Sequence, residues 1–279
     1  MTEDRRRQGV AGPRLPSLYI PHGGGPCFFM ADPPGREGMW DRMAAFLRGI
    51  LPALPARPAA FLVISAHWEA PVPTVTTGTA PPLLFDYYGF PEHTYRLSWP
   101  APGAPDLAAR VRALLAAAGH DCDGDDARGF DHGVFVPFLL IDPEAGIPTV
   151  QLSLRDGLDP AGHLALGRAL APLRDEGVLI VGSGLSYHNL RSLFAAEDGA
   201  AIAAERFDAW LGQAAAAPSA QREAMLAGWA AAPGALACHP RAEHLLPLMV
   251  AAGAGGEDAG RRMFHDRIAG KPVSAFAFG

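Results

Sequence analysis

Four histidines in this sequence stand where side chains are well placed to do chemistry. His22 follows a short apolar run and precedes three glycines, and His67 and His188 each follow a run rich in Val, Ile and Leu. His132 lies in an Asp-His-Gly loop that leads into another apolar run. Neutral imidazole is the commonest metal ligand in proteins. The joint placement of these residues predicts a mononuclear metal site.

A fifth candidate element is the run His239-Pro-Arg-Ala-Glu243-His244. Pro240 suits the first turn of a helix, so we expect a helix to begin here. On such a helix His239 and Glu243 share one face, whereas His244 points away from it. A metal ion bound by the other histidines needs a further ligand, and we expect either His244 or Glu243 to contribute it.

The types of candidate ligand limit which metal ions would bind here. Histidine and carboxylate ligands suit Zn(II) or Fe(II), and three protein ligands with open positions are typical of non-haem iron oxygenases. Zinc also takes three ligands and a water in hydrolytic sites. The compact zinc motifs are excluded, because the sequence has no HExxH and no His-x-His pair.

Apolar runs and helical periodicity alternate along the chain, which predicts the elements that position these histidines. This order indicates an α/β fold: a single domain with a central mixed β-sheet flanked by helices on both faces. We expect residues 1–16 to be a flexible N-terminal segment and residues 17–279 to be one catalytic domain. The predicted strands are 17–20, 60–65, 149–152, 178–181 and 273–278, and the predicted helices are 39–50, 105–118, 160–176, 202–214, 221–230 and 241–251. The segment 71–102, rich in Pro and aromatic residues, is interpreted as an ordered excursion near the site.

Composition indicates which binding partners and which cellular compartment to expect. Lys and Arg total 23 against 29 Asp and Glu, a net charge of -6 that argues against a nucleic-acid partner. No window approaches the ~18 consecutive apolar residues of a membrane span, so no membrane is expected. Three cysteines without CxxC spacing fit a reduced compartment, and we expect the cytoplasm. A hydrophobic content of 49% is compatible with a homodimer.

The ordered set of motifs resembles that of the DODA-type extradiol ring-cleaving dioxygenases, in the class III (protocatechuate 4,5-dioxygenase β-chain) superfamily. The resemblance runs from about Leu18 to the carboxyl-terminal Gly279. The motifs that carry it are His22-Gly-Gly-Gly, Ile64-Ser-Ala-His67-Trp-Glu, Asp86-Tyr-Tyr-Gly-Phe-Pro, Asp131-His-Gly, Gly182-Ser-Gly-Leu-Ser-Tyr-His188-Asn-Leu and His239-Pro-Arg-Ala-Glu-His244.

The resemblance also implies roles for individual residues. It implies that His22 and His67 bind the metal and that His244 takes the third-ligand position, where the superfamily at large has a glutamate. It implies that His188 is the acid/base histidine, with a possible fourth contact to the metal. His132 matches a histidine that acts in catalysis either by supporting a metal ligand or by binding substrate. The ligand set would then be three histidines.

The implied function is a non-haem metal-dependent extradiol dioxygenase that cleaves the aromatic ring of a catecholic substrate, DOPA- or protocatechuate-like, with O2. Fe(II) is expected for activity, and Zn(II) is possible as the bound ion. We expect substrate contacts from Trp68, Tyr88 and His239. A carboxylate on the substrate would find a bidentate partner in Arg128, Arg155 or Arg241.

Two alternatives share the same residues. One is a zinc-dependent hydrolase in which metal-bound water attacks an ester or amide. The other is a non-enzymatic metal-binding member of the superfamily, because one fold can carry several functions. His188 argues against the second alternative, since a protein that only binds metal needs no free base beside the ligands.

Overall fold

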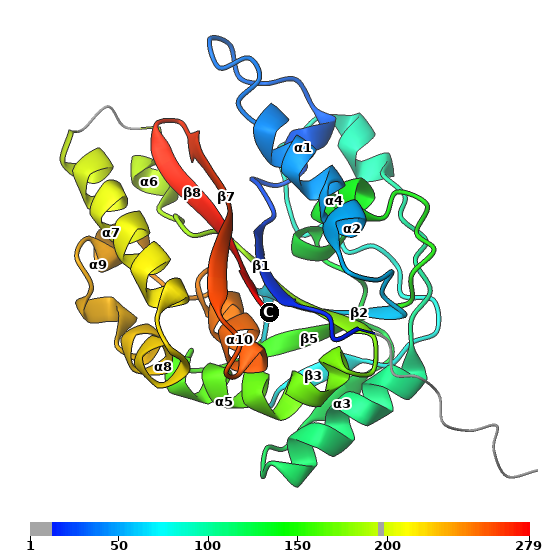
Figure 1. Cartoon of the computed structure of the whole chain (residues 1–279). Coiled ribbons are helices and arrows are strands. Elements are labelled where there is room, and N and C mark those ends of the chain that lie inside the picture. Colours follow the sequence, from blue (N-terminus) through cyan, green and yellow to red (C-terminus); the bar gives the residue numbers. More distant parts are fainter. Residues whose placement is uncertain (1–12, 195–197) are drawn as a thin grey trace, which may run out of the picture.

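A mixed eight-stranded sheet runs through the centre of the computed structural model (Figure 1). The structure describes residues 13–194 and 198–279, so most of the segment predicted to be flexible, 1–16, lies outside the described residues. The strand order is β4-β3-β5-β2-β6-β1-β8-β7. The strands are β1 (Ser17–Pro21), β2 (Ala60–Ala70), β3 (Thr74–Thr76), β4 (Asp123–Asp125), β5 (Thr149–Arg155), β6 (Val178–Gly184), β7 (Gly260–Ile268) and β8 (Lys271–Phe278).

The four central strands are parallel, which fixes where the site can form. β5, β2, β6 and β1 pair in parallel in that order. β8 pairs antiparallel with β1, and β7 pairs antiparallel with β8. On the other side β3 is antiparallel to β5. The carboxyl ends of β1, β2 and β6 therefore meet at one edge of the sheet, the edge at which open α/β sheets bind ligands.

Helices cover both faces of this sheet. α4 contacts β2 and β6, and α10 contacts β1, β2 and β6. They lie on opposite faces, because Gly182 and Gly184 approach the α10 side while Ser183 between them reaches α4. The helices are α1 (Asp41–Arg48), α2 (Ile50–Ala53), α3 (Pro105–Ala117), α4 (His132–Ile141), α5 (Pro160–Leu170), α6 (Leu190–Leu193), α7 (Asp198–Ala216), α8 (Ser219–Ala227), α9 (Ala235–Cys238) and α10 (Leu246–Gly255). The predicted fold class is confirmed.

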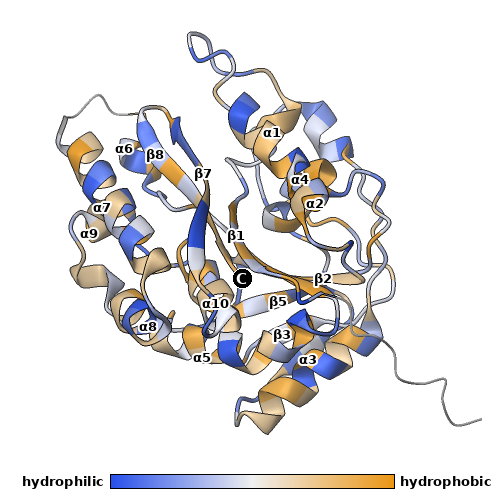
Figure 2. Cartoon of the chain, in the orientation of Figure 1, coloured by the Kyte–Doolittle hydropathy of each residue, from blue (hydrophilic) through white to orange (hydrophobic). Residues whose placement is uncertain are grey.

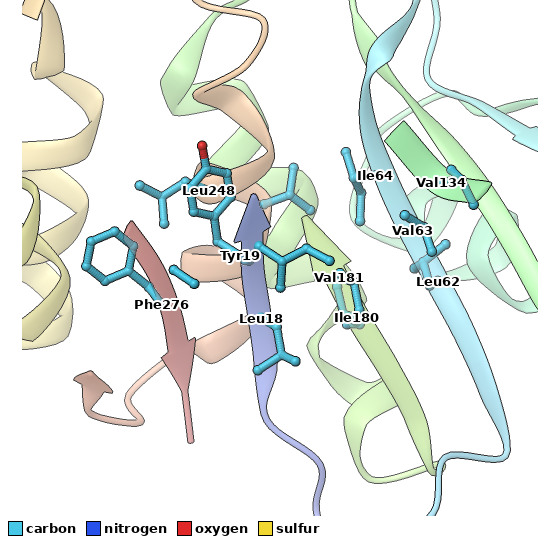
Figure 3. Packing of buried hydrophobic residues seen from close by; sticks show 14 of the residues in the cluster. Leu18, Tyr19, Leu62, Val63, Ile64, Val134, Ile180, Val181, Leu248 and Phe276 are labelled. Carbon is cyan, nitrogen blue, oxygen red and sulfur yellow. The ribbon is translucent and has the colours of Figure 1, made fainter. Parts of the chain in front are cut away.

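The core lies on both sides of the central strands. β1 and β6 are buried along their whole length, as parallel strands covered on both faces must be. Leu18, Ile180 and Leu62 belong to three neighbouring strands and pack within one cluster (Figure 3). Figure 2 shows apolar residues along these strands, whereas the outer helices α3 and α7 alternate between polar and apolar residues. No helix among the described residues is long and apolar enough to cross a membrane.

The predicted strands are confirmed, but the predicted helix 241–251 begins too early. Residues 240–245 form bends and turns, and α10 starts at Leu246. The carbonyl of His244 accepts hydrogen bonds from the backbone N–H of Leu185 and from the hydroxyl of Tyr19, so this segment bonds to the sheet edge. His239 and Glu243 therefore do not share a helical face.

Several elements were not predicted, among them the four-residue helices α6 and α9. α4 is apolar on every side and is almost wholly buried, so it has no amphipathic period that would reveal a helix. β7 is an edge strand with a largely charged outer face. β3 and β4 are each three residues long. β3 lies within the excursion predicted over 71–102, and β4 follows the predicted helix 105–118.

Candidate metal centre and substrate cavity

Five histidines line one cavity of about 400 Å³ at the carboxyl edge of the parallel strands. They are His22, His67, His132, His188 and His244. Three of them, His22, His132 and His244, are buried, and the other two are partly buried. The five histidines that the sequence singled out as ligands or catalytic groups are thus together, although more than two hundred residues separate the first from the last.

Each histidine is positioned by a different element. His22 directly follows β1, His188 lies four residues after β6, and His132 is the first residue of α4. His67 lies within β2, where the register with β5 shifts between Ile64 and Glu69, and not after the end of a strand as the sequence suggested. The irregularity re-aims the side chain toward the cavity, as bulges near active sites commonly do.

A glycine lets the segment that carries His244 reach the sheet edge. A Cβ on Gly184 would collide with the carbonyl oxygen of His244. The backbone N–H of Leu185 donates to the same carbonyl at 3.1 Å, and the hydroxyl of Tyr19 donates to it at 2.7 Å. His244 is therefore held by main-chain contacts to β6 and by a side chain from β1, independently of its own imidazole.

His22 and His67 point their Nε2 atoms at each other across 3.2 Å. The Ser183 hydroxyl donates to the Gly133 carbonyl, so its oxygen accepts from Nδ1–H of His22 at 3.2 Å. This leaves a lone pair on Nε2 of His22. Two imidazole nitrogens bound to one cation at about 2.1 Å stand roughly 3.0–3.4 Å apart for angles of about 90° to 109°. The observed separation falls within this range.

Glu243 orients two further imidazoles. Its Oε1 atom lies 2.9 Å from Nδ1 of His244 and 3.3 Å from Nδ1 of His188. Each Nδ1 is thereby the protonated nitrogen, and each Nε2 keeps its lone pair. Carboxylates that fix the tautomer of a ligating histidine in this way are a general feature of metal sites. Glu243 therefore supports His244 from behind and is not itself turned into the cavity.

Asp86 does the same on the other side of the cavity. Its Oδ1 accepts from Nδ1 of His132 at 2.8 Å and from the backbone N–H of His132 at 2.9 Å. Its Oδ2 lies 3.8 Å from Nδ1 of His67. One carboxylate thus fixes the start of α4 and the ring of His132. Asp86 was quoted within a motif, but no role was predicted for it.

Burial keeps the candidate ligands neutral. It holds the pKa of His22 and of His67 well below the ordinary imidazole value, and it lowers the pKa of His244 to about 3. Burial by itself raises the pKa of Glu243, but hydrogen bonds from His188 and His244 outweigh it and hold that pKa well below its usual value. Neutral imidazoles backed by an ionised carboxylate form a donor set that fits a divalent cation such as Fe(II) or Zn(II).

Two groupings of possible ligand atoms lie side by side at this edge. His22, His67 and His132 form one, and His188, Glu243 and His244 form the other. The groups touch, because the ring centres of His22 and His67 lie 5.2 Å and 4.9 Å from that of His244. The predicted set of His22, His67 and His244 therefore spans both groupings, with His132 and His188 on either side of it.

The three predicted substrate contacts lie outside the cavity lining. The indole of Trp68 stacks with the Arg128 guanidinium at 4.6 Å. The side chain of Tyr88 is exposed to solvent. His239 is fully buried between Phe207 and Trp229, and its Nε2 lies 3.0 Å from the carbonyl of Ser186. Trp68 lies within β2 and Tyr88 in the excursion, and residue type alone does not say which way either side chain points.

Other aromatic and apolar side chains form the cavity wall instead. Tyr87 and Phe90 come from the excursion that the sequence placed near the site. Trp40 and Met39 precede α1, and Leu190 begins α6. Trp40 and Met39 were not predicted, although their position after a glycine-rich turn was visible in the sequence.

None of the three arginines considered for a substrate carboxylate lines this cavity. Arg241 binds Glu69 through both nitrogens at 2.5 Å, and Arg128 donates to the backbone of His67. Arg155 lines a different cavity beside α5. The described part of the chain thus leaves the candidate metal site without a guanidinium in its wall.

Known proteins resemble this chain over most of its length. A family model described as the catalytic LigB subunit of aromatic ring-opening dioxygenase matches residues 16–277. A protein of Hapsidospora irregularis named "Dioxygenase tasH" is 38% identical over 287 residues, which cover 98% of this chain and 87% of that protein. A protein of Beta vulgaris named "4,5-DOPA dioxygenase extradiol" is 43% identical over 211 residues, covering 75% of this chain and 78% of the relative.

A solved structure has the same fold. The crystal structure of an uncharacterised protein from Escherichia coli K12 superposes with a TM-score of 0.75 and is 28% identical in sequence. The match covers 95% of this chain and 100% of that one. The likeness therefore extends over the whole sheet and its helices, including the edge at which the histidines meet.

Proposed function

The chain belongs to the family of catalytic LigB subunits of aromatic ring-opening dioxygenases and is an extradiol ring-cleaving enzyme, and on this premise we propose how its site works. We propose that His22, His67 and His244 hold one ferrous ion and that a catechol binds beside it in the histidine-lined cavity. The ring would be opened next to the two hydroxyls with O2 as the second substrate. The proposal is carried by the convergence of His22, His67 and His244 on one cavity, with Nε2 of His22 and Nε2 of His67 3.2 Å apart, a separation that two ligands of one ion can adopt.

A bound Fe(II) ion supplies open positions for the two catechol oxygens and for O2, and a path for electrons between them. Three imidazoles leave those positions free. The protein holds both reactants next to each other, which lowers the entropic part of the barrier. Ser183 and Glu243 keep His22 and His244 in the tautomers that bind the ion.

We assign the proton transfers to His188. Its Nδ1 faces Glu243, so its Nε2 is left to take the proton of a catechol hydroxyl and to return it later. His132, fixed by Asp86 on the opposite side of the cavity, is proposed to hydrogen-bond the bound substrate. The fourth contact considered for His188 is thus assigned to the substrate and not to the metal.

The two alternative functions are less well supported. A zinc hydrolase would use the same three ligands, but the relatives reported above are named as dioxygenases. A protein that only binds metal has no need of the Glu243–His188 contact. The reaction is proposed to run in the cytoplasm, in keeping with three cysteines that are all free thiols. The homodimer remains a prediction.

The test is an assay with defined metal. The protein is stripped of metal, reloaded anaerobically with Fe(II), and mixed in air with catechol, 4-methylcatechol and L-DOPA. We expect a yellow semialdehyde to form with one O2 consumed per ring opened, and the Zn(II)-loaded protein to be inactive. Iron bound at one per chain with no absorbance change for any catechol would contradict the proposal.

A further inference from the structure

The wall of the histidine-lined cavity carries no fixed charge. Apart from the five histidines, the lining side chains in the described part of the chain are glycine, apolar or aromatic residues, with Cys27 and Tyr87 as the remaining ionisable groups. Burial raises the pKa of the Cys27 thiol to about 12, and it raises the pKa of Tyr87 above its usual value, so both are neutral. The hydroxyl of Tyr87 already donates to the carbonyl of Thr94.

From this wall we infer that the enzyme selects catechols whose ring substituent is uncharged and apolar over catechols that carry a carboxylate or an ammonium group. The inference rests on the proposed function, because it concerns the part of the substrate that extends away from the metal. It separates this chain from relatives named for DOPA, whose side chain carries both charges.

The apolar wall has room for a substituent. The cavity of about 400 Å³ lies in the range of sites that bury a drug-sized ligand, well beyond the needs of a bare catechol ring. Trp40 and Phe90 lie along it, and Ile268 of β7 contributes an aliphatic surface. Leu190 and Phe194 at the mouth are 67% and 53% exposed, so much of their apolar surface faces solvent. An alkyl or aryl substituent would cover them.

Three charged groups beside the cavity are already paired. Arg241 is bound to Glu69, and Arg128 is stacked on Trp68 and bonded to Asp131. Glu243 is held by His188 and His244. An ammonium group would find no free carboxylate in the described lining, and a carboxylate would meet no free cation there.

One cation does stand at the rim. The guanidinium of Arg36 lies 4.7 Å from the centre of the ring of Phe194, which is one of the lining residues. It covers an aromatic ring and is not itself among the lining residues. Because Arg36 is held over Phe194 and does not itself line the cavity, short substituents probe the apolar wall most directly. The inference is therefore tested with short substituents.

The expected discrimination follows from the loss of hydration. A buried charged group without a partner loses its water and gains nothing in return. Even one unsatisfied polar group in a binding site changes affinity by about tenfold or more. We therefore expect at least a tenfold preference for the neutral member of a matched pair.

The matched pair is 4-propylcatechol and 3-(3,4-dihydroxyphenyl)propionate, which differ only in the end of a three-carbon chain. With the Fe(II)-loaded enzyme, kcat/KM for 4-propylcatechol should exceed that for the propionate by about tenfold or more, chiefly through KM. The kcat/KM for L-DOPA should be as low as that for the propionate, because its side chain is also charged. Equal values, or a higher value for the propionate, would overturn the inference.

Binding provides a readout that does not depend on turnover. Titration calorimetry of the metal-loaded protein under argon measures the dissociation constants of both compounds, and the same tenfold order is expected. If neither catechol is cleaved, the proposed function fails, yet the two dissociation constants still decide the inference. Equal affinities would refute it whether or not the ring is opened.

A substitution at the mouth of the cavity tests whether the uncharged wall causes the expected preference. Leu190→Arg places a guanidinium on an exposed lining position and should shift the kcat/KM ratio toward the propionate by about tenfold. Leu236→Arg is the control, because Leu236 is also an exposed leucine, at 62%, but belongs to α9 and lies outside the cavity lining. An unchanged ratio in Leu190→Arg would show that the wall does not select the substituent.

Discussion

At the scale of single residues, the site depends on groups that never face the cavity. Ser183 and Glu243 hold the protonated nitrogens of His22, His188 and His244, so the unprotonated nitrogens point inward. Asp86 does the same for His132. This orientation decides which nitrogen of an imidazole can act as a metal ligand or as a base, because only the nitrogen with a lone pair can serve in either role.

The first prediction separates base from ligand. His188→Ala should lower the turnover of any cleaved catechol by about 10² to 10⁴, the usual contribution of a general base, and should leave one iron per chain. Semialdehyde formation and metal analysis check both parts. His120→Ala is the control, since His120 lines a separate cavity. Loss of iron from His188→Ala would make His188 a ligand.

The second prediction concerns the carboxylate behind His244. Glu243→Gln replaces an acceptor for two N–H groups with an amide that presents a donor to one of them. Metal affinity should fall by about 10- to 100-fold, as measured by competition with a chelator. Glu205→Gln removes an exposed carboxylate paired with Arg267 and should leave the affinity unchanged. Equal affinities in the two variants would exclude an orienting role for Glu243.

At the scale of elements, the decisive feature is the contact between the end of β6 and the segment before α10. The sequence predicts a helix over 241–251, yet residues 240–245 bond to the sheet edge through the His244 carbonyl. Local propensity favours a helix, but two hydrogen bonds to Leu185 and Tyr19 stabilise the turn instead. His244 reaches the cavity because this helix begins late.

The third prediction tests that contact. Gly184→Ala adds a Cβ that collides with the His244 carbonyl, so it should lower the free energy of unfolding by about 1–3 kcal/mol and weaken metal binding. Urea unfolding and metal analysis measure the two effects. In Gly199→Ala, within α7, the added Cβ meets nothing within 4 Å, and stability should be kept or slightly raised. Full stability and metal content in Gly184→Ala would show that the approach is dispensable.

At the scale of the whole molecule, the fold buries several neutral imidazoles, which links stability to pH. Burial lowers the pKa of His239 to about 4, below the ordinary value of 6.5. Between about pH 4 and pH 6.5, His239 is therefore protonated in the unfolded chain but neutral in the folded chain. Stability from this group is complete above pH 6.5 and is lost as the pH falls toward 4.

The fourth prediction follows from this linkage. Between pH 7 and pH 5 His239 alone should remove about 2 kcal/mol from the free energy of unfolding. His239→Gln keeps a donor for the Ser186 carbonyl and cannot titrate, so its stability should fall less over the same range. Urea unfolding at several pH values compares the two proteins at constant metal content. Parallel curves would show that His239 does not carry this part of the acid sensitivity. The variant should also keep its kcat/KM, because His239 lies outside the cavity lining.

The sequence by itself determined the buried strands, the order of the motifs and the histidines that line the cavity. Runs such as 178–181 read as buried strands because both faces of the sheet are covered, and parallel strands bring His22 and His188 to one edge. Only the tertiary structure decided which nitrogen each imidazole presents, and that Trp68, Tyr88 and His239 are not in the cavity lining. These choices depend on side chains distant in sequence, such as Glu243 beside His188, and no local period encodes such contacts.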